Sequence, residues 1–235
     1  MKKLPTLFFA AAVLIGLPTI LRAEGTADSS LPQEAQEVVQ KAALLQTYRT
    51  KFALEAKGEK EGENLRIEGT LIFKRPNLRH MELKKSDTGE MQGILVSDGK
   101  TEWQYSPAEK VVYRMATQVE VPGPHRPFAE TKPETVRFIK RFREGEEDRV
   151  QFEAVPLASL IEGAPAPVKK LRVDIGAQDG LVRQFNLLND KDEVIFSQKY
   201  EGIEVGASVM DTDFKFTIPA GVSVVDVPEQ PKTAQ

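Results

Sequence analysis

Short stretches in which apolar and polar residues alternate recur along most of this 235-residue chain, and turn-forming residues separate them. Alternation with a period of two is typical of a strand that buries one face. Two Asp-Gly pairs, Asp98-Gly99 and Asp179-Gly180, lie between such stretches and favour β-hairpins, because tight turns need a residue that accepts positive φ. The sequence therefore predicts about ten consecutive antiparallel strands. A sheet of that size curls or closes, because every strand has one apolar face to bury.

Two segments instead have the spacing of amphipathic helices. In the first, Ser30 and Gln33 form a capping box, and apolar residues three and four positions apart predict a helix over 31–46. In the second, prolines within 122–127 interrupt the strands, and a capping signal precedes a helix that we expect over 135–142. The sheet then either wraps a packed core or forms a trough that these two helices cover.

The first 23 residues have the layout of a secretory signal peptide. Two lysines precede an apolar run over 4–21, and Ala23 is a small residue suited to cleavage. An apolar run of about 18 residues could also anchor a chain in a membrane, but Gly16 and Pro18 interrupt this one. We therefore expect export and cleavage near Ala23. The expected parts of the chain are a signal peptide over 1–23, a flexible lead-in over 24–30, a single domain over 31–227 and a disordered tail over 228–235.

Composition and motifs argue against several functions. The chain has no cysteine, which excludes disulfides and lipid attachment through an N-terminal cysteine. The leader holds three of the 32 basic residues, which leaves 29 against 35 acidic ones, so nucleic acid is not an expected partner. His80 and His125 lie far apart, whereas metal ligands cluster, so we expect no metal and no cofactor. The sequence contains no nucleophile–base or phosphate-binding motif, and we do not expect an enzyme.

One apolar strand column ends in a cation. Alternate residues from Leu65 to Phe73 are Leu, Ile, Gly, Leu and Phe, and the next position in the column is Arg75. Its stem could extend the apolar face while the guanidinium reaches water. Alternatively, the guanidinium could point into the hollow and donate to a carbonyl of whatever covers it, since arginine has five donors and no acceptor. Trp103 and Tyr105 also have two interpretations, as sheet core or as a sugar platform, and the pattern favours core.

Three motifs, in order along the chain, resemble the outer-membrane lipoprotein carrier family, LolA. They are FKRPNL (73–78), LVSDGKTEWQYSP (95–107) and FKFTIPAGVSVVD (214–226). The resemblance spans 31–227, although residues 115–166 depart from the family pattern. It implies a mainly β (α+β) fold, with a curved antiparallel sheet forming an unclosed half-barrel of about ten to eleven strands. A helical lid would lie over a hydrophobic cavity.

The resemblance also implies a function. The protein would be a monomeric periplasmic chaperone that takes acylated lipoproteins from an inner-membrane ABC transporter and passes them to an outer-membrane receptor, with transient membrane contact only. In that family the arginine of the Lys-Arg-Pro-Asn motif latches the lid, and this role falls on Arg75. A second hypothesis is a lipid- or lipoprotein-sensing regulatory module on a related fold. An enzyme acting on lipids or glycans is a third, disfavoured by the missing motifs.

The apolar strand columns and helix stripes supply the residues that we expect an acyl chain to contact. The cavity-lining candidates are Phe52, Leu54, Leu65, Ile67, Leu71, Phe73, Met81, Leu83, Trp103, Tyr105, Val111 and Tyr113. The lid candidates are Val38, Val39, Leu45, Phe138, Ile139 and Phe142.

Overall fold

The computed structural model describes residues 30–57, 64–117, 123–161, 164 and 166–228. The predicted signal peptide, nearly all of the predicted lead-in and the tail beyond Pro228 lie outside the described residues. Within the part of the chain that is described, no helix is both long enough and apolar enough to cross a membrane.

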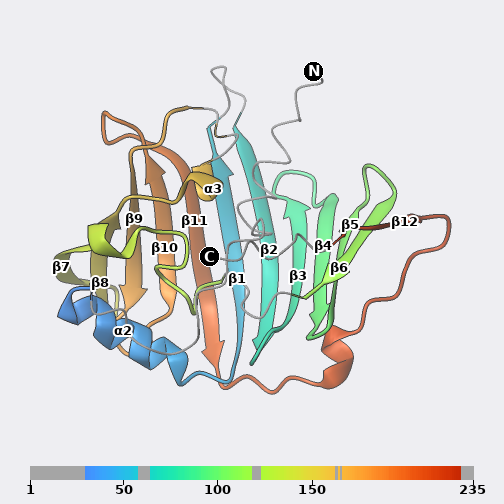
Figure 1. Ribbon diagram of the computed structural model, residues 1–235, viewed down its shortest axis with the longest axis horizontal. Helices are drawn as coiled ribbons and strands as arrows, with labels where there is room; N and C mark the ends of the chain where they lie inside the picture. Colours follow the sequence, from blue (N-terminus) through green and yellow to red (C-terminus); the bar gives the residue numbers. More distant parts are fainter. Residues whose placement is uncertain (1–29, 58–63, 118–122, 162–163, 165, 229–235) are drawn as a thin grey trace. The chain divides into compact units, whose positions relative to one another are not determined.

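Most described residues belong to twelve β-strands (Figure 1). The strands are β1 (Thr47–Ala56), β2 (Leu65–Lys74), β3 (Leu78–Lys85), β4 (Met91–Asp98), β5 (Thr101–Ser106), β6 (Val111–Ala116), β7 (Arg137–Glu144), β8 (Glu147–Ala154), β9 (Lys170–Gly176), β10 (Val182–Leu188), β11 (Val194–Val205) and β12 (Ser223–Asp226). Their hydrogen-bonded order is β12-β6-β5-β4-β3-β2-β1-β11-β10-β9-β8-β7. This order has two ends, so the sheet is unclosed and the predicted mainly β class is confirmed.

The helical elements are few, and the described residues group into two compact units. The helices are α2 (Gln33–Ala43), α3 (Ala158–Ile161) and the 3-10 turns η1 (Pro133–Thr135) and η2 (Asp211–Phe214). The first unit holds α2, α3 and β7 to β10, together with most of β11 and the second half of β1. The second unit holds β3 to β6, β12 and most of β2, together with the first residues of β1 and the last of β11.

In the first unit, α2 packs against the turn between β9 and β10 (Figure 1). The helix predicted over 31–46 is present over a shorter range. Its buried stripe consists of Ala35, Val38 and Ala42. The hairpin turn contains Gly180 with a φ of 73°, and a Cβ there would collide with the carbonyl oxygen of Val38. Glycine therefore lets the helix backbone approach the hairpin closely.

The predicted second helix, over 135–142, is wrong. The capping signal produces only the single turn η1, and the backbone of Val136 is already extended, with φ −65° and ψ 124°. The residues that follow form the edge strand β7. The lid candidates that lie on this strand rather than on a helix are Phe138, Ile139 and Phe142.

Pairing with β8 explains why this segment is a strand. The spacing of four between Phe138 and Phe142 fits a helix, but an isolated helix of eight residues is marginal in water. The turn at Gly145, with φ 62°, instead folds the segment back on β8. In that register Phe138 pairs with Phe152, and their rings meet edge to face with centroids 6.0 Å apart. Tertiary packing thus overrides the local helical pattern.

The second unit has two distinct sheet faces. Its strands β2 to β6 pair in antiparallel order, and β12 pairs parallel to β6. Register places Leu71, Met81 and Leu95 side by side on one buried face. Trp103 pairs with Val96 and therefore lies on the opposite face. We call the Leu71 side the apolar face of the second unit.

The segment around η2 covers the Trp103 side of this unit. The ring of Trp103 stacks on Phe216 with centroids 6.2 Å apart. Phe214 is buried, and the Nδ1 atom of His80 lies 2.7 Å from the carbonyl oxygen of Asp213. This face is therefore packed by the chain itself.

Candidate functional site

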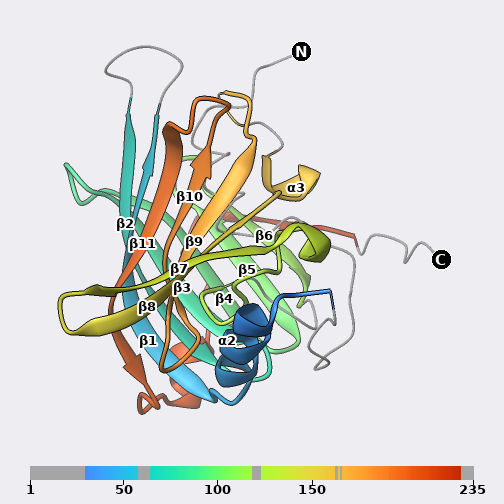
Figure 2. The ribbon, with the colours of Figure 1, turned by 90° about the vertical axis from the view of Figure 1, so that its left-hand side faces the viewer.

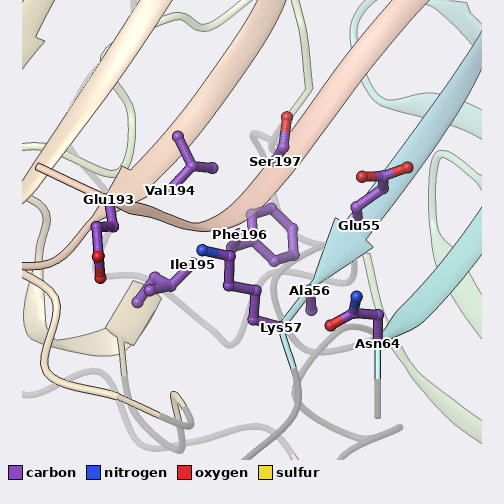
Figure 3. A pocket seen from close by; sticks show the side chains of 9 residues that line it. All are labelled: Glu55, Ala56, Lys57, Asn64, Glu193, Val194, Ile195, Phe196 and Ser197. Atoms are coloured by element: carbon purple, nitrogen blue, oxygen red, sulfur yellow. The ribbon is translucent and has the colours of Figure 1, made fainter. Parts of the chain in front are cut away.

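Two pockets of the first unit are candidate sites, and their walls differ in character. The first has a volume of about 340 Å³ and lies beside the end of β1 and the start of β11 (Figure 3). Glu55, Lys57 and Glu193 bring exposed, charged side chains to its wall, while Ile195 and Phe196 are buried. Hydrated charged walls offer an apolar ligand little free energy of transfer from water. This pocket suits a small polar ligand.

The second pocket, which we call the covered pocket, has a floor of strand residues and a cover of loop residues. Its floor comes from β9, β10 and β11 and consists of Leu171, Val173, Val182, Phe185, Gln198 and Tyr200. Its cover consists of Leu160 of α3 and of Gly123, Pro124, Arg126, Pro127, Ala129, Glu130 and Thr131. Figure 2 shows α3 and the yellow-green segment before β7 on the same side of these strands.

Strand register makes the floor apolar. Phe185 pairs with Val173 on one side and with Gln198 on the other, so three neighbouring strands present these side chains to one face. The ring of Tyr200 lies 6.2 Å from that of Phe52. The amide of Gln198 donates a 2.8 Å hydrogen bond to the Tyr200 hydroxyl, so these two polar side chains of the floor contact each other.

The cover is a proline-rich segment, residues 123–131, that cannot join the sheet. Pro124 and Pro127 are buried in it, and proline has a fixed φ and no N–H to offer a strand ladder. The N–H of Val182 donates a 2.9 Å hydrogen bond to the carbonyl oxygen of Pro124, which ties the cover to the floor. Phe128 packs edge-on against Phe152, with centroids 5.2 Å apart. At its other end the cover is tied to the chain after β8, because the N–H of Leu157 donates a 2.9 Å hydrogen bond to the carbonyl oxygen of Glu130. Side-chain packing and isolated backbone hydrogen bonds thus hold the cover in place.

The covered pocket is small in this structure. Its volume is about 80 Å³, whereas pockets that hold a small molecule usually measure about 300–1,000 Å³. A ligand the size of an acyl chain therefore fits only after the 123–131 segment moves. The apolar floor beneath it is the surface that such a movement exposes.

Burial is the main cause of the pKa shifts of the titratable groups at this pocket. Burial raises the pKa of the Glu130 carboxyl, and the nearby Arg126 partly opposes that rise. Burial also raises the pKa of the Tyr200 hydroxyl, against a smaller opposite effect of the hydrogen bond from Gln198. Tyr200 is therefore neutral at physiological pH, and the floor carries no charge.

The structure distributes the cavity-lining candidates over both units. Phe52 and Leu54 are buried in the first unit. The candidates on the apolar face of the second unit are Ile67, Leu71, Phe73, Met81, Leu83, Val111 and Tyr113. Leu65 lies at the start of β2 and is half-buried.

The other two cavity-lining candidates, Trp103 and Tyr105, lie on the opposite face of the second unit. They pair with Val96 and Ile94, so the residues of β5 that share a face with Leu95 are Glu102 and Gln104. The candidates were chosen by apolar character, whereas alternation along the strand assigns faces by position.

Arg75 lies one residue beyond the end of β2, in the turn before β3, and is half-buried. Its backbone N–H donates a 2.8 Å hydrogen bond to the carbonyl oxygen of Gln46. Of the lid candidates on α2, Val38 is buried and Val39 is half-buried. Leu45 lies two residues beyond the end of α2 and is half-buried.

The floor and cover of the covered pocket are residues that the candidate set missed. Leu171, Val173 and Phe185 stand in alternating columns, and they are as apolar as the columns that were chosen. The prolines of 122–127 marked a break in the strands but gave no sign of where the segment would lie. Among the described residues, no group of three His, Asp or Glu side chains is placed to hold a metal ion.

The sequence matches a protein-family model over residues 43–217, and that family is described as outer membrane lipoprotein carrier protein LolA. Two relatives bear the name outer-membrane lipoprotein carrier protein. The one from Vibrio campbellii is 30% identical over 169 residues, which are 71% of this chain and 73% of the relative. The one from Salmonella typhi is 29% identical over 159 residues, which are 68% of this chain and 71% of the relative.

A solved structure shows the same fold. An uncharacterized conserved protein from Thermus thermophilus superposes with a TM-score of 0.58. The match covers 83% of this chain and 100% of that one, at 14% sequence identity.

Proposed function

Because the chain belongs to the LolA family of outer-membrane lipoprotein carrier proteins, we propose that it binds the acyl chains of lipoproteins and carries them through the periplasm. It receives them from an inner-membrane ABC transporter and delivers them to an outer-membrane receptor, as a monomer that touches membranes only transiently. The observation that supports this function best is the covered pocket, whose apolar floor lies beneath a proline-rich segment.

The free energy of an acyl chain in water explains the need for a cover. Each methylene removed from water gains roughly 0.8 kcal/mol, so a chain of about 16 carbons gains on the order of 10 kcal/mol. A hydrogen bond such as that from Val182 to Pro124 contributes about 1 kcal/mol net. Acyl binding therefore supplies more free energy than such a hydrogen bond does, and in this proposal the cover opens when an acyl chain arrives. The empty protein keeps the same apolar surface away from water.

Release has to offset the same free energy. The carrier therefore needs a receptor that offers the chain a better apolar environment. The transporter and the receptor, and not the carrier, determine the direction of transfer. In this proposal the cover, with α2 as a further part of the lid, closes behind the departing chain.

Transfer of a lipoprotein between membranes tests this function. Spheroplasts that display a newly made lipoprotein are incubated with the mature protein, and the soluble fraction is then mixed with outer membranes. The proposal predicts a soluble stoichiometric complex, seen by native mass spectrometry, followed by loss of the lipoprotein to the membranes. If the protein releases no acylated protein, or if native spectra show a signalling ectodomain bound in its place, the carrier function is wrong.

Arg75 is proposed as the lid latch, the role that the resemblance to the LolA family implies. Substitution Arg75→Leu should weaken the closed state, so that the variant accepts cargo but passes several-fold less of it to outer membranes. The control is Arg66→Leu, which removes an arginine whose ion pair with Glu55 is solvent-exposed and contributes little. Equal transfer by wild type and Arg75→Leu would show that Arg75 is not a latch.

A further inference from the structure

The apolar face of the second unit contains a buried ion pair. Arg79 of β3 and Glu102 of β5 both pair with Ser97 of the intervening strand β4, so the three residues form one row across the sheet. The Nη2 atom of Arg79 lies 2.7 Å from the Oε2 atom of Glu102. The two side chains are 3% and 6% exposed. Their neighbours in the column, Met81 and Leu95, are apolar and equally buried.

The hydrogen bonding of this pair is one-sided. Both carboxylate oxygens of Glu102 accept, Oε2 from Arg79 and Oε1 from the amide of Gln104 at 2.8 Å. On Arg79, however, the buried Nε and Nη1 atoms have no acceptor among the described residues. Buried donors without an acceptor are rare in native proteins because they forfeit their hydration. The guanidinium thus has two buried N–H-bearing nitrogens, among apolar neighbours, that can still donate hydrogen bonds.

We infer that Arg79 is a ligand-binding residue whose Nε and Nη1 groups donate to the carbonyl oxygen of the ester that links an acyl chain to its carrier. This inference rests on the proposed function, which supplies an acylated ligand, and it concerns the apolar face of the second unit by itself. An acyl chain of a lipoprotein ends in a carbonyl, so a second chain of the ligand, lying along Met81 and Leu95 and not on the floor of the covered pocket, brings that acceptor into the same row. The protein then recognises acyl esters rather than hydrocarbon in general.

Charge favours a neutral carbonyl over an anion at this position. Glu102 already neutralises Arg79, and an anionic ligand would meet the carboxylate across a short distance in a poorly hydrated site. A carbonyl oxygen accepts the spare N–H groups without that repulsion. Phosphate and free fatty acid are therefore the weaker ligands.

Two lipopeptides that differ only at the linkage test the inference. One carries two palmitoyl chains as esters and the other carries hexadecyl chains as ethers, which keeps the apolar chains but removes the carbonyls. Affinities for the whole mature protein are measured by displacement of a fluorescent apolar dye. Wild type should prefer the ester by about tenfold, the effect of one hydrogen bond from a charged donor.

Variants show whether the preference comes from this pair. The double substitution Arg79→Met/Glu102→Leu removes both charges together and leaves neither one unpaired, and it should abolish the preference while retaining ether binding. The matched control Arg114→Met/Asp226→Leu removes an exposed pair of the same unit and should keep the preference. Equal affinity of wild type for both lipopeptides, or tighter binding of palmitate than of its methyl ester, overturns the inference. Failure of wild type to bind either lipopeptide overturns the proposed function itself.

Discussion

At the scale of single residues, two arginines stand at apolar strand columns in different settings. Arg75 follows the strand and lies in a turn, whereas Arg79 stands within the next strand on the apolar face. The two positions differ in how much the guanidinium depends on hydrogen-bond partners within the protein. A half-buried guanidinium in a turn can reach water, but a buried one needs partners.

The sequence indicated the first of these cations and not the second. Arg75 interrupts an apolar column and belongs to a family motif. Arg79 and Glu102 are 23 positions apart, and only the register of three strands shows that they face each other. Register depends on turns and bulges, which a pattern of alternating residues does not determine by itself.

The buried carboxyl at the covered pocket gives a prediction for pH dependence. Burial raises the pKa of Glu130, so the folded state binds its proton more tightly than the unfolded state. Between the unfolded and the raised folded pKa, the free energy of unfolding therefore decreases as pH rises. Above both values a buried carboxylate keeps destabilising the fold. Glu130→Gln should raise the free energy of unfolding at pH 7 and have little effect at pH 4.

Urea unfolding of wild type and Glu130→Gln at several pH values between 4 and 8 measures this difference. The exposed Glu134→Gln, in the same loop region, serves as the control and should show no comparable trend. A difference between wild type and Glu130→Gln that is equal at pH 4 and pH 7 would show that the carboxyl is not destabilised by its surroundings.

At the scale of elements, the docking of α2 depends on one glycine. Gly180 and Gly145 are both hairpin glycines with positive φ, 73° and 62°. A Cβ at Gly180 would collide with Val38, whereas a Cβ at Gly145 has no atom within 4 Å. Gly145→Ala should therefore cost about 1–2 kcal/mol for backbone strain alone. Gly180→Ala should cost about 2 kcal/mol more, because the helix has to shift.

Free energies of unfolding from urea titrations compare these two variants directly. An equal loss of unfolding free energy in both variants would mean that α2 shifts without cost and does not depend on its close approach to the Gly180 turn. We also expect faster proteolysis within α2 in Gly180→Ala and not in Gly145→Ala, because only the first substitution displaces the helix.

Movement of the cover gives a second prediction at this scale. The N–H of Val182 donates to Pro124 of the cover, and the N–H of Lys169 donates to Leu188 of β10 at 2.8 Å. Adding a diacylated lipopeptide should speed hydrogen exchange at Val182, because the cover lifts, and should leave Lys169 unchanged. Slower exchange at Val182 would mean that the ligand binds without opening the cover.

Elements differ in how well their sequence predicts them. The hairpins at Asp98-Gly99 and Asp179-Gly180 were predicted correctly because their turn residues carry the information locally. The strand β7 was not predicted. Its sequence RFIKRFRE fits the period of a helix as well as that of a strand, and only pairing with β8 decides between the two. The short strand β12 pairs parallel to β6 across more than 100 residues, and no local pattern specifies such a contact.

At the scale of the whole molecule, the sequence predicted the mainly β class, the unclosed sheet and the family. These follow from alternation repeated along the chain and from three motifs. It did not predict which segment covers which strands, because the 123–131 segment has no periodicity. Its prolines exclude a strand but leave its path to be set by packing of Phe128 and by the hydrogen bond from Val182.

In the proposed function an acyl chain lies on the floor of the covered pocket, beneath the 123–131 segment. A lipopeptide with a diazirine in its acyl chain, photolysed in complex with the mature protein and mapped by mass spectrometry, measures this directly. We expect crosslinks at floor residues such as Leu171, Val173 and Phe185. Crosslinks confined to residues 193–197, at the charged pocket of Figure 3, would contradict it.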